Sequence, residues 1–351
     1  MVLLGLNEVP RPITHVRKRL EFETMTDPLL TVEHLRVEFP TRRGTLVAID
    51  DVSFEIREGE ILGVVGESGA GKSITGMSII GLLDPPGRIA GGQITLDGQR
   101  IDNLPYEAMR RIRGKRIGAI FQDPLTSLNP LYTIGQQLTE TIQTHADMSL
   151  ARARRRAIEL LDEVGIPAAE RRIDNYPHQF SGGMRQRVVI ALALCTSPRL
   201  IIADEPTTAL DVSVQAQIIA LLKQLSREHG AAVMLVTHDM GVIAETADRV
   251  AVMYAGRIAE IGPVKTVIQR PRHPYTVGLM GSIPTLGERT GRLVQIEGAM
   301  PRLTDIPAGC AFHPRCPKVF ARCAAARPDL LPADPCQAAC WLYDEAALAH
   351  A

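Results

Sequence analysis

Residues 66–73 have the sequence GESGAGKS, a glycine-rich loop that matches G-x-x-x-x-G-K-[ST] at every fixed position. The apolar residues 60–65 before the loop predict a buried strand, and the apolar spacing of residues 74–83 predicts a helix after it. Glycines between a strand and a helix let backbone N–H groups surround a phosphate chain at the N-terminus of the helix. The sequence therefore predicts an α/β fold of the P-loop NTPase (RecA-like) class with a phosphate site in this loop.

All eight residues of this loop are candidates for the nucleotide site. We expect Lys72 to reach the β- and γ-phosphates and the Ser73 hydroxyl to bind Mg²⁺. The full set of candidates in the loop is Gly66, Glu67, Ser68, Gly69, Ala70, Gly71, Lys72 and Ser73.

An apolar strand that ends in two acids predicts a second part of the site. Residues 199–206 have the sequence RLIIADEP, typical of a buried parallel strand whose C-terminal end faces a nucleotide. We expect Asp204 to hold Mg²⁺ through water and Glu205 to orient or deprotonate the attacking water. A third strand is predicted at residues 231–237, and His238 follows it where a side chain could reach the γ-phosphate.

Between these strands the sequence resembles one family. The segment SGGMRQR at residues 181–187 is similar to the signature motif of the ATPase subunits of ABC transporters. The resemblance covers about residues 28–265 and implies ATP and Mg²⁺ as cofactors. It places Gln122 in the Q-loop, where this side chain joins Ser73 and Asp204 at the Mg²⁺ site.

Three further positions match motifs of the same family. Asp211 corresponds to the D-loop aspartate, and His238 corresponds to the switch histidine, which acts with Glu205 and Gln122 in hydrolysis. Phe39 matches the aromatic position that stacks on adenine, although a phenylalanine there could equally be a core residue.

The signature motif implies a second ATPase chain. In the family this motif binds the nucleotide of the opposite subunit, and the residues implied are Ser181, Gly182, Gly183 and Gln186. The glycines open a helix, so its N–H groups and dipole favour a γ-phosphate. The chain has one phosphate loop and one signature motif, so two composite sites need two chains. The partner is a second copy or, as we favour, a related subunit.

The same motifs divide the chain into parts. Residues 1–27 are expected to be a flexible extension, and residues 28–265 an ATPase domain in which strands and helices alternate from about residue 30. Residues 123–180 form a helical subdomain, with a helix at 149–165 that starts at a serine N-cap, has solvated arginines and buries Ile158, Leu161 and Val164. Residues 266–351 form a small C-terminal region.

The C-terminal region points to a branch of the family. The segments at 270–286, 309–317 and 339–343 resemble the C-terminal part of the oligopeptide/dipeptide branch of ABC importers. The resemblance implies ATP-driven import of di- or oligopeptides with two membrane permease subunits and, indirectly, an extracytoplasmic peptide-binding protein. A helix of a permease would enter a groove that residues 123–138 line.

Two other functions stay open at this point. Nickel or another small solute could be the cargo, because the receptor and membrane subunits select it. A soluble ABC ATPase that acts on nucleic acid or the ribosome is the other alternative. The formal net charge of zero opposes a bulk electrostatic grip on nucleic acid, so we expect no nucleic-acid partner.

Five of the six cysteines lie in the C-terminal region, with the spacing C-x5-C-x6-C-x12-C-x3-C. Structural zinc prefers closer pairs, which only Cys336 and Cys340 approach. In the peptide-importer branch, matching cysteines hold a [4Fe–4S] cluster, and the resemblance implies the ligands Cys310, Cys316, Cys323 and Cys340. Zinc is the alternative metal. Either would add folding free energy to a segment with few apolar elements, which makes this a small metal-binding region.

The N-terminus and the apolar runs bear on localisation. No apolar run approaches the ~18 residues that span a bilayer. The first 24 residues do not form a secretory signal, because proline interrupts the apolar stretch and the basic residues follow it. They are an extension or an over-long gene model, since residues 25–35 look like a natural start. We expect a peripheral protein on the cytoplasmic face of the inner membrane, where thiols stay reduced.

Overall fold

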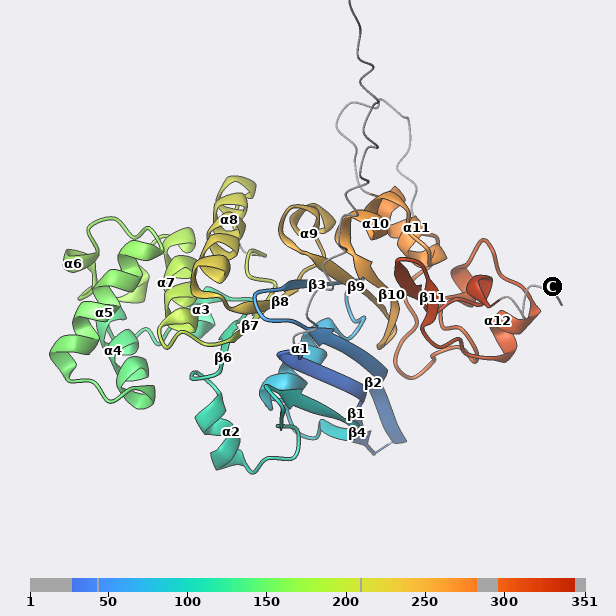
Figure 1. Cartoon of the computed structure of the whole chain (residues 1–351), viewed down its shortest axis with the longest axis horizontal. Helices are drawn as coiled ribbons and strands as arrows, with labels where there is room; N and C mark the ends of the chain where they lie inside the picture. Colours follow the sequence, from blue (N-terminus) through green and yellow to red (C-terminus); the bar gives the residue numbers. More distant parts are fainter. Residues whose placement is uncertain (1–26, 43, 209, 283–295, 345–351) are drawn as a thin grey trace, which may run out of the picture.

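The computed structural model describes residues 27–42, 44–208, 210–282 and 296–344. Figure 1 shows a helical part (green) at one end, sheets in the middle, and the cysteine-containing C-terminal part (red) at the other end. The extension predicted at residues 1–27 lies outside the described residues, apart from residue 27.

The first sheet is antiparallel, with the strand order β2-β1-β4-β5. Burial alternates along much of its first strand, typical of a sheet with one face against the core. The expectation that strands and helices alternate from about residue 30 is wrong here, because two long strands follow each other and pair along their length. The strands are β1 (Leu30–Thr41), β2 (Gly44–Ile56), β4 (Arg88–Leu96) and β5 (Gln99–Arg100).

The second sheet of the described residues has eight strands in the order β11-β12-β10-β9-β3-β8-β7-β6. The five strands from β9 to β6 in this order run parallel, and β10, β12 and β11 continue the sheet antiparallel. The strands are β3 (Ile61–Val65), β6 (Ile117–Ile120), β7 (Leu200–Asp204), β8 (Ala232–Val236), β9 (Arg249–Tyr254), β10 (Arg257–Pro263), β11 (Leu331–Ala333) and β12 (Cys336–Ala338).

The core has a layer on each face of this sheet. Along β3, Ile61 and Val65 belong to one hydrophobic cluster, and Leu62 and Val64 belong to the other. Successive side chains of a strand point to opposite faces, so a strand that is buried on both faces needs an unbroken apolar run. The run LIIA of β7 and the run AVMLV of β8 meet the same requirement.

Helices follow the strands of the central sheet. Figure 1 shows α8, α9 and α10 along one side of it and α1 toward the antiparallel sheet. The helices are α1 (Lys72–Ile80), α2 (Tyr106–Ile112), α8 (Val212–His229), α9 (Met240–Thr246), α10 (Val264–Gln269) and α11 (Pro274–Gly281). Within the described part of the chain, no helix combines the length and the apolar character that crossing a membrane requires.

The segment between β6 and β7 is helical. Its third helix, α5, starts at the predicted place, but Ser149 makes no side-chain cap hydrogen bond. The helix buries Ala153, Ala157, Leu160 and Leu161, so the predicted Leu161 is confirmed. The predicted Val164, its C-cap, is also buried, and Ile158 packs half-buried on the same core. The helices are α3 (Pro124–Ser127), α4 (Ile134–His145), α5 (Leu150–Glu163), α6 (Ala169–Arg172) and α7 (Gly182–Leu194).

The C-terminal region is anchored on the central sheet. β12 pairs antiparallel with β10, and Ala338 lies opposite Glu260. The Glu260 carboxylate is fully buried and accepts the backbone N–H groups of Arg272 and His273 at 2.9 and 2.8 Å. The remaining pieces are 3₁₀ turns at His313–Arg315 and Trp341–Tyr343 and the helix α12 (Ala321–Ala325).

Candidate nucleotide site and cysteine cavity

Four parallel strands end at one edge of the central sheet, and a predicted site residue lies at or just after each end. β3 leads into the phosphate loop, and β7 ends at Asp204. β6 is followed by Gln122 and β8 by His238. Because the carboxyl ends of parallel strands meet at the same edge, residues far apart in sequence converge there.

The phosphate loop needs its glycines. Gly66 has φ +154°, and a Cβ there would lie 2.3 Å from the carbonyl oxygen of Met253. Gly71 has φ +105° and precedes α1, where a Cβ would lie 2.6 Å from Ile49 Cδ1. Only glycine combines such backbone angles with so close an approach. The loop therefore has the tight path that presents backbone N–H groups to an anion.

Lys72 lies across the inside of this loop. Its Nζ donates to the carbonyl oxygens of Gly66 and Glu67 at 2.8 and 3.2 Å, and the side chain is buried. Burial lowers the pKa of Lys72, while Glu205 and Asp204 oppose that shift. The ammonium is thus held next to the loop and beside two carboxylates.

Ser73 and Asp204 meet at the end of β7. The Ser73 hydroxyl donates to Asp204 Oδ1 at 3.0 Å. Burial raises the pKa of Asp204, and the hydrogen bond from Ser73 opposes this. A hydroxyl and a carboxylate are hard oxygen ligands of the kind that Mg²⁺ prefers.

Glu205 is the centre of a polar cluster. Its carboxylate accepts from Gln122 Nε2 at 3.0 Å and from the Thr208 hydroxyl at 2.8 Å, and its Oε1 lies 3.3 Å from His238 Nδ1. Burial opposes its ionisation, but the contacts with Thr208 and His238 hold the pKa of Glu205 below its ordinary value. The side chain is therefore a charged carboxylate at neutral pH, as a base or a water-orienting group must be.

The backbone also sets the direction of Glu205. Its φ of +46° is in the left-handed region, and its N–H donates to the Val236 carbonyl at 2.8 Å. A non-glycine residue in this region is uncommon and needs support from its surroundings. Thr208, which provides some of that support, was missed by the sequence analysis, because a threonine three residues after an acid gives no motif by itself.

The signature residues form a separate surface. Ser181 caps α7 and accepts the Met184 N–H at 3.4 Å. A Cβ on Gly183 would lie 2.7 Å from Val214, which follows the D-loop residue Asp211. Asp211 in turn caps α8 and accepts the Val214 N–H at 3.0 Å. Among the contacts of the described residues, no hydrogen bond or ion pair joins this surface to the phosphate loop of the same chain.

Two other candidates have less support from the geometry. Gln186 is 1% exposed, and its amide nitrogen and oxygen have no hydrogen-bond partner within the described chain. Phe39 lies near the end of β1 and packs closely on the loop between α1 and β4. A Cβ on Gly87 in that loop would lie 2.6 Å from the Phe39 ring. The expected roles of both residues stay predictions.

Four of the five C-terminal cysteines line one cavity, and the lining cysteines are Cys310, Cys316, Cys323 and Cys340. Burial raises the pKa of the Cys310 and Cys316 thiols, and it raises that of Cys340 to about 11. Cys336 lies elsewhere, on β12, where a Cβ on Gly262 would meet its sulfur at 2.5 Å. Four thiols on one cavity are donors of the type that iron–sulfur and zinc sites use.

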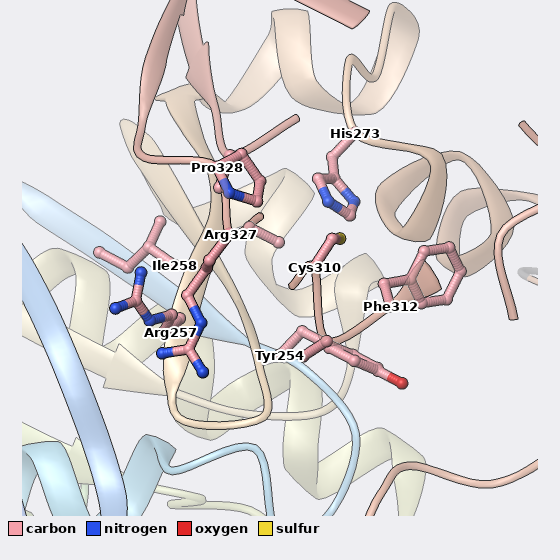
Figure 2. A pocket seen from close by; sticks show the side chains of 11 residues that line it. Tyr254, Arg257, Ile258, His273, Cys310, Phe312, Arg327 and Pro328 are labelled. Carbon is pink, nitrogen blue, oxygen red and sulfur yellow. The ribbon is translucent and has the colours of Figure 1, made fainter. Parts of the chain in front are cut away.

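A second cavity adjoins the first at the junction with the ATPase sheet. Figure 2 shows Cys310, Phe312, His273 and Tyr254 around it.

Within the residues that the structure describes, no group of three or more His, Cys, Asp or Glu side chains is arranged to hold a metal ion. The metal site therefore stays a prediction.

The sequence of this chain matches two family models. Residues 49–208 match the model described as ABC transporter, and residues 259–323 match the model described as oligopeptide/dipeptide transporter, C-terminal region. The chain is also 48% identical over 306 residues to the oligopeptide transport ATP-binding protein OppD of Escherichia coli (strain K12), covering 87% of this chain and 90% of that protein. The chain belongs to the ABC transporter ATPase family.

Other relatives agree with this assignment. The ABC ATPase described here is 47% identical over 323 residues to the dipeptide transport ATP-binding protein DppD of Bacillus subtilis (strain 168), covering 92% of this chain and 96% of that protein. Among solved structures it resembles a dimeric ATP-binding cassette in a post-hydrolysis state with ADP and Pi, with a TM-score of 0.60 and 32% identity. That likeness covers 67% of this chain and 98% of the cassette, and it confirms the predicted P-loop ABC fold.

Proposed function

We propose that this ABC ATPase binds and hydrolyses ATP to power a membrane importer of di- or oligopeptides. The observation that carries the proposal is that one chain joins the converged phosphate-loop and carboxylate cluster to the oligopeptide/dipeptide transporter C-terminal region. Relatives named as oligopeptide and dipeptide transport proteins, each covered over most of its length, support peptides as the cargo.

We assign the residues of the cluster to roles in hydrolysis. The phosphate loop and Lys72 would bind the phosphates, and Phe39 would stack on adenine. Mg²⁺, held through Ser73, Asp204 and Gln122, would neutralise phosphate charge. These assignments rest on the contact between Ser73 and Asp204 and on the hydrogen bond from Gln122 to Glu205.

Glu205 would take or orient the attacking water. Its contacts with Gln122 and His238 support this, because both of these side chains could also contact a bound γ-phosphate. His238 would contact the γ-phosphate and keep Glu205 aligned. A carboxylate whose pKa is held low stays ready as an acceptor over the neutral pH range.

A second ATPase chain would complete each site. The surface formed by Ser181, Gly182, Gly183 and Gln186 would bind the partner's nucleotide, next to the D-loop Asp211. Val212, directly after the D-loop, is 84% exposed, as an apolar residue at an interface would be in an isolated chain. We favour a related subunit over a second copy as the partner.

Permease subunits would dock on the helical subdomain at 123–180. We propose that this subdomain is part of an ATPase domain that spans residues 28–265. Leu125, Leu131 and Tyr132 are 61%, 80% and 49% exposed within the segment that was predicted to line the docking groove. This apolar surface supports docking to another protein. The relatives support a peripheral position on the cytoplasmic face of the inner membrane, with two permeases and, indirectly, an extracytoplasmic peptide-binding protein.

In the C-terminal region 266–351, we propose that Cys310, Cys316, Cys323 and Cys340 hold a [4Fe–4S] cluster, with zinc as the alternative. The cavity that these four residues line supports the choice, as does the separate position of Cys336. When bound, the cluster would supply a structural cross-link. Cys310 and Cys316 flank one turn, while Cys323 lies in α12 and Cys340 precedes the last 3₁₀ turn, so a shared metal would join three segments that have a small apolar core.

The test is hydrolysis in the assembled transporter. The full chain is co-expressed with the membrane and receptor subunits that co-purify with it, and ATP turnover in detergent is measured with di- and tripeptides, with Ni²⁺, and with RNA. Stimulation by peptides alone supports the proposal. Stimulation by Ni²⁺ would move the cargo to a metal, and stimulation by RNA without membrane subunits would place the chain among soluble ABC ATPases.

A further inference from the structure

The C-terminal region touches the phosphate loop directly, at three points. Arg315 donates to both carboxylate oxygens of Glu67 at 3.1 and 3.3 Å. The Tyr275 hydroxyl accepts the Glu67 backbone N–H at 3.0 Å. A Cβ on Gly69 would lie 3.1 Å from Met300 Cε. Residues more than 200 positions downstream thus lie against the loop that holds the phosphates.

Arg315 is fixed on all sides. Its side chain is 8% exposed, and the carboxylate of Glu67 is its acidic partner. Its Nε and Nη2 donate to the carbonyl oxygens of Glu297 and Gly298 at 2.9 and 3.2 Å, and Nη1, the donor to Glu67, also donates to the Tyr254 hydroxyl at 3.3 Å. A guanidinium held by so many acceptors keeps one orientation.

The turn that carries Arg315 belongs to the cysteine cavity. Arg315 directly precedes Cys316, and the His313 N–H at the start of the same turn donates to the Cys310 carbonyl at 2.9 Å. Phe312, in this turn, packs on Tyr254 and Tyr275 with ring centroids 5.3 and 5.5 Å apart. The cysteine segment and the phosphate loop are therefore joined through one short turn.

Glu67 puts a negative charge into a loop that must bind a triphosphate. An uncompensated carboxylate there would repel the phosphates, and the low exposure of the pair reduces screening by solvent. We propose that Arg315 is a positioning residue of the nucleotide site, which neutralises Glu67 and holds the loop in its binding shape. The C-terminal region then sets ATP affinity through the 310–316 turn. This inference needs ATP binding at the loop but neither a peptide cargo nor a metal.

Removing one charge or the other from the Glu67–Arg315 pair should change ATP affinity in opposite directions. For the full chain at low salt, we expect Arg315→Ala to weaken equilibrium ATP binding about tenfold, as the loss of a charged hydrogen bond implies. Glu67→Gln alone should tighten binding by about two- to threefold, because Arg315 is left unbalanced. The double variant should return to within about twofold of the wild type, and the Arg315→Ala defect should shrink at about 0.5 M salt.

Two more variants separate charge from folding. Arg302→Ala removes an exposed arginine from the same region and should leave ATP affinity unchanged. Arg315→Lys keeps the charge and should lose less affinity than Arg315→Gln, which gives a readout even if the alanine variant is poorly folded. Wild-type affinity in Arg315→Ala and Arg315→Gln overturns the proposal. A double variant as weak as Arg315→Ala also overturns it, since loss of packing cannot be rescued at Glu67. The expected pattern of ATP affinities combined with absent peptide stimulation would instead count against the transport function alone.

Discussion

The Ser73 hydroxyl donates a hydrogen bond of 3.0 Å to the Asp204 carboxylate, across 131 positions of sequence. The first residue follows the strand β3 and the second ends the strand β7, so the fold itself brings together the two side chains proposed to bind Mg²⁺. This contact joins the phosphate loop to the carboxylate pair Asp204 and Glu205, and the first two predictions concern that pair.

Replacing Asp204 with asparagine should weaken Mg²⁺ binding and reduce ATP hydrolysis. A neutral amide is a weaker ligand for Mg²⁺ than a carboxylate, so we expect turnover to fall at least about 100-fold. Hydrolysis is measured as a function of Mg²⁺ concentration. Asp174→Asn, at an exposed ion pair with Arg154, is the matched control and should behave like the wild type. An Asp204→Asn protein with unchanged Mg²⁺ dependence contradicts the assignment.

Glu205→Gln should separate binding from turnover. The amide keeps the size and the hydrogen bond from Thr208, but it cannot accept a proton, so hydrolysis should fall by about 10²- to 10⁴-fold while ATP affinity stays. The variant should also accumulate a closed ATPase dimer, visible as a shift in size-exclusion chromatography with ATP. Near-normal turnover of this variant in the assembled transporter is the result that rules out Glu205 as the base.

The cysteine cavity predicts opposite results for two neighbours. In protein purified without oxygen, Cys340→Ser should lose iron and sulfide and loosen the C-terminal region, because its thiol lines the cavity. Cys336→Ser should keep both, since its sulfur packs on Gly262 instead. Metal analysis and limited proteolysis measure the two effects. Zinc without iron in the wild type would favour the alternative metal, and loss of metal in Cys336→Ser alone would contradict the ligand set.

Asp50 links three parts of the chain and predicts an acid-sensitive contribution to stability. Burial opposes its ionisation, but Arg257 and Arg327, with Arg36, hold its pKa below the ordinary value of 3.8. The unfolded chain therefore takes up this proton at a higher pH than the folded chain. The stabilisation is complete above about pH 4–5 and is lost as the pH falls through the folded pKa.

The variant that tests this is Asp50→Asn. It should lower the free energy of unfolding by about 2 kcal/mol at pH 7, because it leaves partly buried arginines without their acid. It should also lose less stability than the wild type between pH 5 and about pH 3. Urea titrations at each pH provide the measurement. Glu107→Gln, at an exposed i,i+3 pair, is the control, and equal acid sensitivity of wild type and Asp50→Asn would contradict the account.

The sequence predicted those elements whose pattern is local. The run before Gly66 and the runs that end at Asp204 and at His238 are uninterrupted and apolar, which only strands buried on both faces require. The strand–loop–helix motif then indicates the edge of the sheet at which the C-terminal ends of these strands meet. The antiparallel sheet β2-β1-β4-β5 is not predicted, because the pairing of β1 with β4 joins segments that are far apart in the sequence.

What escaped prediction depends on contacts between distant segments. Arg315 sits in a cysteine motif, and nothing in that motif indicates that its guanidinium reaches Glu67, 248 positions away. Tyr275 is likewise an apolar-helix residue whose hydroxyl caps a loop amide. The buried face of α5 also includes Ala153 and Ala157, because small side chains allow close helix packing, which apolar periodicity alone does not indicate.

The central claim is ATP-driven peptide import, and transport of a trapped peptide out of inverted sealed vesicles tests it most directly. The complete transporter is reconstituted with its ATPase side outward, with the receptor and a labelled tripeptide trapped inside, and export of label into the medium on addition of MgATP is measured. We expect ATP-dependent movement of the peptide with the wild-type chain and none with Glu205→Gln or without ATP. Movement of peptide that is equal in all three cases, or ATP hydrolysis with no peptide movement in a complete assembly, would contradict the account.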